Sequence, residues 1–150
     1  MRVRLSVLSA AVVITAAACR HGDEAMNPNP PDSQNAVVLT DSGPRSISPE
    51  EAASIHDAVS AFVRDRWTEV TAAIPENLLE HFPKSAGEPM VDGAGRLRLP
   101  PWLLEAHGDQ LVLTYRPLPP GNFQFVLPLE QQASRWKVTS VSWQKIMPAR

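Results

Sequence analysis

Residues 48–74 read SPEEAASIHDAVSAFVRDRWTEVTAAI, and this stretch decides the fold class. Ser48 offers an N-cap hydroxyl, Pro49 takes the first helical position and Glu51 follows three residues after the cap, which together form a capping box. Apolar residues then recur on one arc of the helical wheel: Ala52, Ile55, Val59, Phe62, Val63, Trp67, Val70 and Ile74. The pattern predicts one long amphipathic helix that ends before Pro75 and packs on a broad apolar surface.

Alternating apolar residues in the second half of the chain predict antiparallel strands. Residues 90–99 indicate a hairpin, and residues 111–115 and 123–129 indicate two further strands with one apolar face each. Pro128 has no amide proton, so its strand is expected at an edge or with an irregularity. The remaining expected elements are a short helix over 76–82, a helical turn over 102–106, and a strand from Trp136 with a bulge near Ser140.

This order of elements predicts an α+β fold, with a long N-terminal amphipathic helix packed on a curved antiparallel sheet. The helix-first order and the segment RWKVTSV at 135–141 resemble the NTF2-like and cystatin-like folds. That resemblance implies a curved sheet that wraps a helix and a pocket between the two. It implies no particular function.

The start of the chain has the three parts of a secretory signal. Met1–Arg4 is cationic, Leu5–Thr15 is largely apolar, and three alanines precede Cys19. The apolar run is shorter than the roughly 20 residues that a membrane-spanning helix needs. These residues predict a targeting segment that is removed.

Small residues directly before a cysteine resemble the lipobox of bacterial lipoproteins. The resemblance implies cleavage before Cys19 and lipid attachment to that cysteine, which would hold the chain at a membrane. Arg20, in place of the aspartate that retains some lipoproteins at the inner membrane, favours the outer membrane, facing the periplasm. The inner membrane and the cell surface are alternatives, as is a soluble product cut after Ala18.

Composition divides the chain into a signal peptide (1–18), a lipidated flexible tether (19–45) and one α+β domain (46–150). The tether is rich in Pro, Asn, Asp and Ser. Its apolar patch Val37-Val38-Leu39 is the exception, and a short strand or a docking segment is the alternative there. Cys19 is the only cysteine, so no internal disulfide is expected.

Charge and motifs limit the classes of function. Removal of Arg2 and Arg4 leaves twelve basic against sixteen acidic residues, so we expect no nucleic acid as a partner. The chain has no phosphate-binding glycine loop, nucleophile elbow or HExxH motif. We therefore expect no cofactor, no resident metal and no enzymatic activity.

Four residues are candidates for binding. Arg96 and Arg98 should leave the same side of a strand close to Trp102, where an anionic or carbohydrate partner could be bound by ion pairing and stacking. His56 lies near the apolar arc of the helix and could line a pocket, although a half-buried histidine with one hydrogen bond is the favoured interpretation. Trp67, Trp136 and Trp143 stand at core positions and are interpreted as packing residues.

Three classes of function remain open. The first is a non-catalytic envelope lipoprotein that binds another protein, as an assembly factor or an immunity protein. The second is a small-ligand carrier or sensor with a pocket near His56. The third, a hydrolase or isomerase, would need acid and base groups that converge on that pocket. The first needs only an anchor, a tether and a compact domain, and we favour it.

Overall fold

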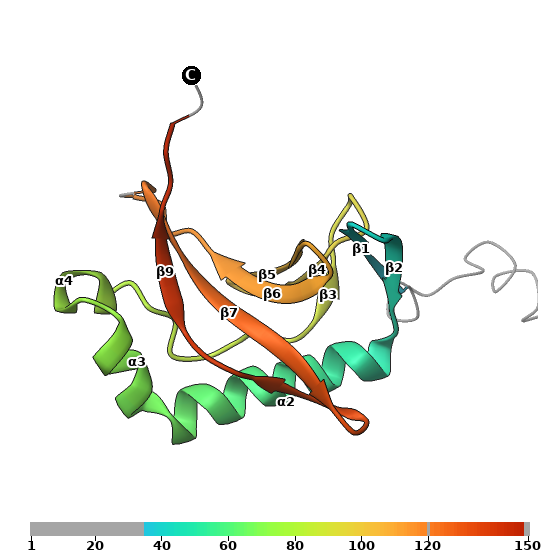
Figure 1. Cartoon of the computed structure of the whole chain (residues 1–150), viewed down its shortest axis with the longest axis horizontal. Coiled ribbons are helices and arrows are strands. Elements are labelled where there is room, and N and C mark those ends of the chain that lie inside the picture. Colours follow the sequence, from blue (N-terminus) through green and yellow to red (C-terminus); the bar gives the residue numbers. More distant parts are fainter. Residues whose placement is uncertain (1–34, 120, 149–150) are drawn as a thin grey trace, which may run out of the picture. The chain divides into compact units, whose positions relative to one another are not determined.

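The computed structural model describes residues 35–119 and 121–148 (Figure 1). The predictions for the signal peptide and for Cys19 concern residues outside these ranges. Within the described residues, no helix combines the length and the apolar character that crossing a bilayer requires. The elements follow in this order: β1 (Ala36–Thr40), β2 (Gly43–Ile47), α2 (Pro49–Asp65), α3 (Trp67–Ala73), α4 (Glu76–Leu79), β3 (Met90–Val91), β4 (Leu97–Leu99), β5 (Trp102–His107), β6 (Gln110–Tyr115), β7 (Phe123–Gln132), β8 (Arg135–Val138) and β9 (Ser142–Lys145).

Helix α2 begins at the predicted cap. The Ser48 hydroxyl accepts the Glu51 amide proton at 3.2 Å, and the Glu51 carboxylate accepts the Ser48 amide proton at 3.2 Å. These two bonds satisfy donors that the first turn of a helix otherwise leaves unpaired. The apolar arc of α2 is buried as expected: Ala52, Ile55, Val59, Phe62 and Val63.

The prediction of a single long N-terminal helix is wrong in two respects. A β-hairpin precedes the helix, and the helix breaks at Arg66, whose φ of −121° and ψ of 30° are not helical. Helix α3 then runs in a different direction from α2 (Figure 1). Val70 of α3 and Ile74, the residue that follows it, are buried. The predicted second helix over 76–82 is also shorter, because α4 ends at Leu79.

Residues 36–47 form a hairpin, so the flexible tether predicted for 19–45 is wrong over its last ten residues. Ala36 and Val38 of β1 are buried at 2% and 6% exposure. The Val37 amide donates to the Gly95 carbonyl at 2.8 Å, which fastens the hairpin to the main sheet. The apolar patch is therefore a strand, because its alternate side chains bury apolar surface in the core.

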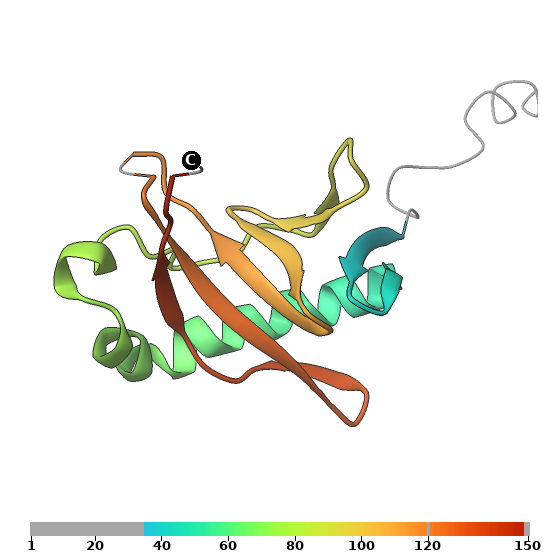
Figure 2. The same cartoon turned by 45° about the horizontal axis from the view of Figure 1, so that its top comes forward.

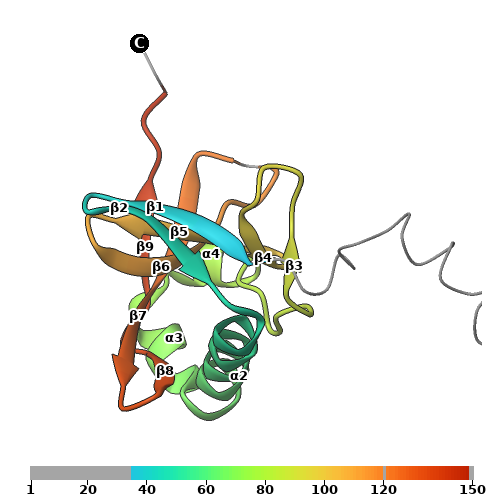
Figure 3. The same ribbon diagram turned by 90° about the vertical axis from the view of Figure 1, so that its right-hand side faces the viewer.

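The main sheet is antiparallel and curled into a half-barrel. Its strands lie in the order β3-β4-β5-β6-β7, and both β8 and β9 pair with the far edge of β7. Figure 3 looks nearly along α2 and shows the strands arching over it, and Figure 2 shows α2 crossing beneath them. The predicted α+β class and the curved antiparallel sheet are thus confirmed.

The helical turn predicted over 102–106 is wrong, because these residues form strand β5. Trp102 and Leu104 are buried, and the residues between and after them are more exposed. This alternation is the period of a strand. Tertiary packing therefore overrides the helical preference of the sequence WLLEA.

The last predicted strand is divided in two. Strand β8 pairs with the second half of β7, and β9 pairs with the first half. Between them, Thr139 donates its amide proton to the Pro128 carbonyl at 3.0 Å. A break over 139–141 thus replaces the bulge predicted near Ser140. It places Trp143 at 40% exposure, so the prediction that Trp143 packs in the core is wrong.

Candidate functional site

The predicted surface patch of Arg96, Arg98 and Trp102 does not exist as a patch. Trp102 is fully buried, with its ring 5.6 Å from Phe82 and 6.1 Å from Tyr115 between centroids. A partner in solvent cannot stack on a side chain in that position. The prediction of an exposed binding tryptophan beside two arginines is therefore wrong.

Arg96 and Arg98 do lie on the same side of the chain, as predicted, and both reach Asp92. Their Nε atoms lie 3.3 and 3.0 Å from Asp92 Oδ2, and the Asp92 carboxylate also accepts the amide protons of Ala94 and Arg96. The Arg96 amide, followed by the Arg98 guanidinium, lowers the pKa of Asp92 from 3.8 to about 2. Both arginines hold the β3–β4 turn together.

His56 contacts the protein backbone and does not line a pocket as the sequence suggested. Its Nε2 lies 3.2 Å from the Ala86 carbonyl oxygen, and its Nδ1 lies 3.6 Å from an Asp57 carboxylate oxygen. A carbonyl only accepts hydrogen bonds, so Nε2 carries the proton in the first contact. The side chain is 21% exposed. His56 lines none of the three grooves described below.

Glu105, His107 and Asp109, which stand at alternate positions from β5 into the β5–β6 turn, do not form a metal-binding group. Glu105 accepts a hydrogen bond from the Thr114 hydroxyl at 3.1 Å, within the sheet. Asp109 accepts from the amide and the hydroxyl of Ser42, both at 2.9 Å, and the hydroxyl bond contributes most to its lowered pKa. No group of metal-binding side chains occurs in residues 35–119 and 121–148.

A groove of about 910 Å³ lies between α2 and β8. We call it the α2–β8 groove, lined by residues from 50–66 and 134–138. Charges of both signs line it. Helix α2 contributes Glu50, Asp57 and Asp65, and β8 contributes Arg135 and Lys137. Arg66, which also lines the groove at the end of α2, is paired with Glu69. The side chain of Asp57 is 86% exposed, so its charge is presented to solvent.

Small side chains make the helix wall of the α2–β8 groove low. Ala53, Ala58 and Ala61 line it, and Trp136, at 7% exposure, forms part of its base. Small residues at such positions let another chain approach the helix closely. The result is an open, partly apolar channel lined by charges of both signs.

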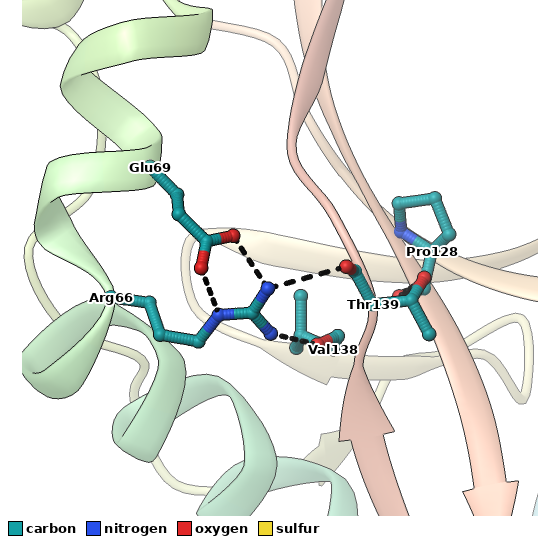
Figure 4. A network of polar contacts seen from close by, with 5 residues as sticks. All are labelled: Arg66, Glu69, Pro128, Val138 and Thr139. Carbon is teal, nitrogen blue, oxygen red and sulfur yellow. Dashed lines mark hydrogen bonds and ion pairs between the residues drawn. The ribbon is translucent and has the colours of Figure 1, made fainter.

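Hydrogen bonds fix the spacing between the two walls. The amide of Trp136 donates to the Ser54 hydroxyl at 3.2 Å, so α2 satisfies part of the outer edge of β8. At the other end, Arg66 donates to the Val138 carbonyl at 3.0 Å and makes a longer contact of 3.5 Å with the Thr139 carbonyl (Figure 4). These hydrogen bonds hold β8 and the following residue against α2 and Arg66.

Glu69 holds Arg66 in place. The Glu69 carboxylate accepts hydrogen bonds from two guanidinium nitrogens, with a distance of 2.7 Å for Arg66 Nε (Figure 4). This bidentate contact raises the pKa of Arg66 and lowers the pKa of Glu69. The guanidinium also lies 5.0 Å from the centroid of the Phe62 ring. Arg66 therefore joins the helix break to the junction between β8 and β9.

Two smaller grooves differ in chemistry. One, of about 410 Å³, is mostly apolar and lies between the start of α2, the β1–β2 hairpin and β3, with Ile47, Ala52 and Leu97 in its lining. The other, of about 430 Å³, lies beside Trp67 and Lys84.

Comparison of the chain with family models, with curated proteins and with solved structures finds no match. The α2–β8 groove was not predicted from the sequence. Trp136 was predicted only as a packing residue, and the charges at 50 and 57 are about 80 residues from those at 135 and 137.

Proposed function

We propose that this chain is a lipid-anchored envelope protein whose half-barrel domain binds another protein in the α2–β8 groove. The anchor would be lipid on Cys19, with the domain on the periplasmic side of the outer membrane. The partner would be a component that the protein helps to assemble or a toxin that it neutralises. The observation that carries the binding proposal is the open groove with small side chains and charges of both signs.

The chemistry of the groove supports a macromolecular segment as its occupant. An amphipathic helix that binds in a groove needs a narrow apolar channel, and flanking charges set its orientation. Here Ala53, Ala58 and Ala61 provide the channel. Glu50 and Asp57 would attract basic residues on one flank of the partner, and Arg135 and Lys137 would attract acidic residues on the other.

A small apolar ligand is the second candidate, and the groove of about 410 Å³ favours it. Its volume lies within the range of about 300 to 1,000 Å³ found for ligand sites, and its lining is mainly apolar. This function was expected to use a pocket near His56. That pocket has no support, because His56 Nε2 is hydrogen-bonded to the Ala86 carbonyl oxygen.

Site-specific photocrosslinking in the native cell envelope tests the groove. A photoreactive amino acid replaces Ala61, which lines the groove, and in a matched control it replaces Ala72, an exposed alanine of α3 outside it. We expect one protein to be crosslinked at position 61 and not at 72. We also expect that product to decrease when Arg135 and Lys137 are both replaced by glutamate. The same products at both positions, or none at either, would contradict the proposal.

Fractionation tests the anchor separately. The Cys19→Ser variant should leave the membrane fraction, and mass spectrometry of the wild-type chain should find acyl groups on residue 19. A wild-type chain in the soluble fraction, cut after Ala18, would refute the anchor and leave the groove proposal intact.

A further inference from the structure

The groove of about 430 Å³ beside α3 brings together the residue types that were expected around residues 96–102. An aromatic ring, two hydroxyls and two cations line it: Ser60, Val63, Arg64, Trp67, Lys84 and Ser85. We call it the Trp67 groove. Its volume lies within the range of about 300 to 1,000 Å³ found for ligand sites, and no acidic residue is among its described lining.

One wall of the Trp67 groove comes from a face of α2 and from the start of α3. Ser60, Val63 and Arg64 lie three or four positions apart, so they share a face of α2. Trp67 is the first residue of α3, and its ring packs edge-on against Phe82 at 5.8 Å between centroids. The indole is partly exposed, so a fixed aromatic ring is open to a ligand.

The opposite wall is the segment that follows α4. Lys84 and Ser85 belong to this segment, and both are exposed. The next residue, Ala86, contacts His56 Nε2 of α2 through its carbonyl oxygen at 3.2 Å. This contact holds the segment beside α2, one turn of the helix before Ser60.

The uncompensated charge of the Trp67 groove is positive. Arg64 donates from Nε and Nη2 to Asp65 at 2.8 and 3.0 Å, so Asp65 offsets much of its charge. Lys84 takes part in none of the ion pairs of the described residues. Lys84 therefore supplies the net charge of the groove, which favours an anionic ligand.

We propose that the Trp67 groove binds an anionic saccharide, with one sugar ring on the Trp67 indole and its carboxylate at Lys84. The C–H groups on one face of a pyranose ring carry partial positive charge and the face of an indole ring is negative, so the two pack together. The hydroxyls of Ser60 and Ser85 both donate and accept hydrogen bonds, as sugar hydroxyls do. A simple anion would leave the indole without a contact, and a neutral sugar would leave Lys84 without one.

The Trp67 groove is separate from the site of the proposed function. The Trp67 groove and the α2–β8 groove share no lining residue, so either can bind its ligand without the other. The polar groups of the Trp67 groove lie at the surface, where an ion pair contributes little. We expect a dissociation constant on the order of 1 mM for a single sugar.

NMR titration measures binding in this range. The full chain carrying Cys19→Ser is titrated with methyl glucuronide, which has the ring and the carboxylate, with methyl glucoside, which has the ring alone, and with acetate. We expect methyl glucuronide to shift the indole N–H signal of Trp67 and the amide signal of Ser85. The indole signal of Trp143, which is 40% exposed on β9, should stay unchanged.

The two partial ligands separate the ring from the charge. Methyl glucoside should bind about threefold more weakly than methyl glucuronide, and acetate should not shift the Trp67 indole signal. No shift with methyl glucuronide, an equal shift of the Trp143 signal, or an equal response to either partial ligand would overturn the proposal.

A lysine variant tests the carboxylate contact. Lys84→Gln removes the charge and should raise the dissociation constant for methyl glucuronide about threefold, with that for methyl glucoside unchanged. Lys137→Gln is the matched control, because Lys137 is exposed and lies outside the Trp67 groove. The circular dichroism spectra of both variants should match that of the parent. Equal effects of the two variants on the glucuronide, or no effect of Lys84→Gln, would overturn the proposal.

Discussion

Replacement of Arg66 by alanine should destabilise the domain more than any other change to an exposed charge near the groove. Arg66 donates to the Val138 carbonyl, contacts the Thr139 carbonyl and lies over the Phe62 ring. These contacts join the end of α2 to residues that follow it by 72 and 73 positions. Arg66→Ala removes all of them at once and leaves the Val138 carbonyl to water.

The magnitude follows from the geometry and the exposure of the side chain. A hydrogen bond from a charged donor contributes about 1.5 to 3 kcal/mol, and a cation over an aromatic ring contributes about 0.5 to 1 kcal/mol at an exposed site. Arg66 is 39% exposed, so solvent screening reduces the first value. We expect a loss of about 2 kcal/mol in the free energy of unfolding, which corresponds to roughly 8 °C in the thermal midpoint.

Chemical denaturation followed by circular dichroism measures this loss. The matched control is Arg64→Ala. Among the described residues Arg64 pairs only with its neighbour Asp65, at 71% and 57% side-chain exposure, so its replacement should have little effect. Arg66→Lys keeps the charge but not the planar donor fork, so its loss should be intermediate. If Arg66→Ala and Arg64→Ala destabilise the domain equally, Arg66 does not hold the helix break to the sheet.

Three other outcomes follow from the described contacts. Asp92→Asn should flatten the pH dependence of the free energy of unfolding. The lowered pKa of Asp92 stabilises the fold by an amount that is complete above about pH 3.8 and is lost as the pH falls toward 2. Acid titrations in which wild type and variant run parallel would contradict this. Trp102→Ala should lower the free energy of unfolding by about 3 to 5 kcal/mol, and Trp102→Phe by about 1 kcal/mol. The second loss is smaller because Trp102 Nε1 has no hydrogen-bond partner within the described part of the chain, so phenylalanine removes no hydrogen bond there. Equal losses in urea denaturation would refute this. Ser42→Ala should return the pKa of Asp109 toward 3.8, measured by NMR titration, and an unchanged value would exclude the Ser42 hydroxyl as its main cause.

Features that depend on neighbouring residues could be predicted from the sequence. The capping box of Ser48 and Glu51 needs only residues three apart, and it was predicted to the residue. The strand alternation in β7 and the side shared by Arg96 and Arg98 also follow from local spacing. In each case, the physical cause lies within one element.

Features that depend on distant residues could not be predicted. Arg66 breaks the helix at a point where its side chain meets backbone carbonyls of β8 and the following residue, which no local pattern reveals. The segment from Trp102 has helical propensity but forms a strand in the core. The α2–β8 groove joins two stretches that lie about 80 residues apart, so its charges become a site only in the folded chain.

The yield of the crosslink from position 61 in living cells tests the central claim most directly. It is measured for the chain with wild-type β8 and for the chain with Arg135→Glu and Lys137→Glu, with position 72 as the reference. Binding in the α2–β8 groove predicts one crosslinked protein at position 61 that falls at least tenfold on charge reversal. A product at position 61 that charge reversal leaves unchanged, or that position 72 gives equally, would contradict it.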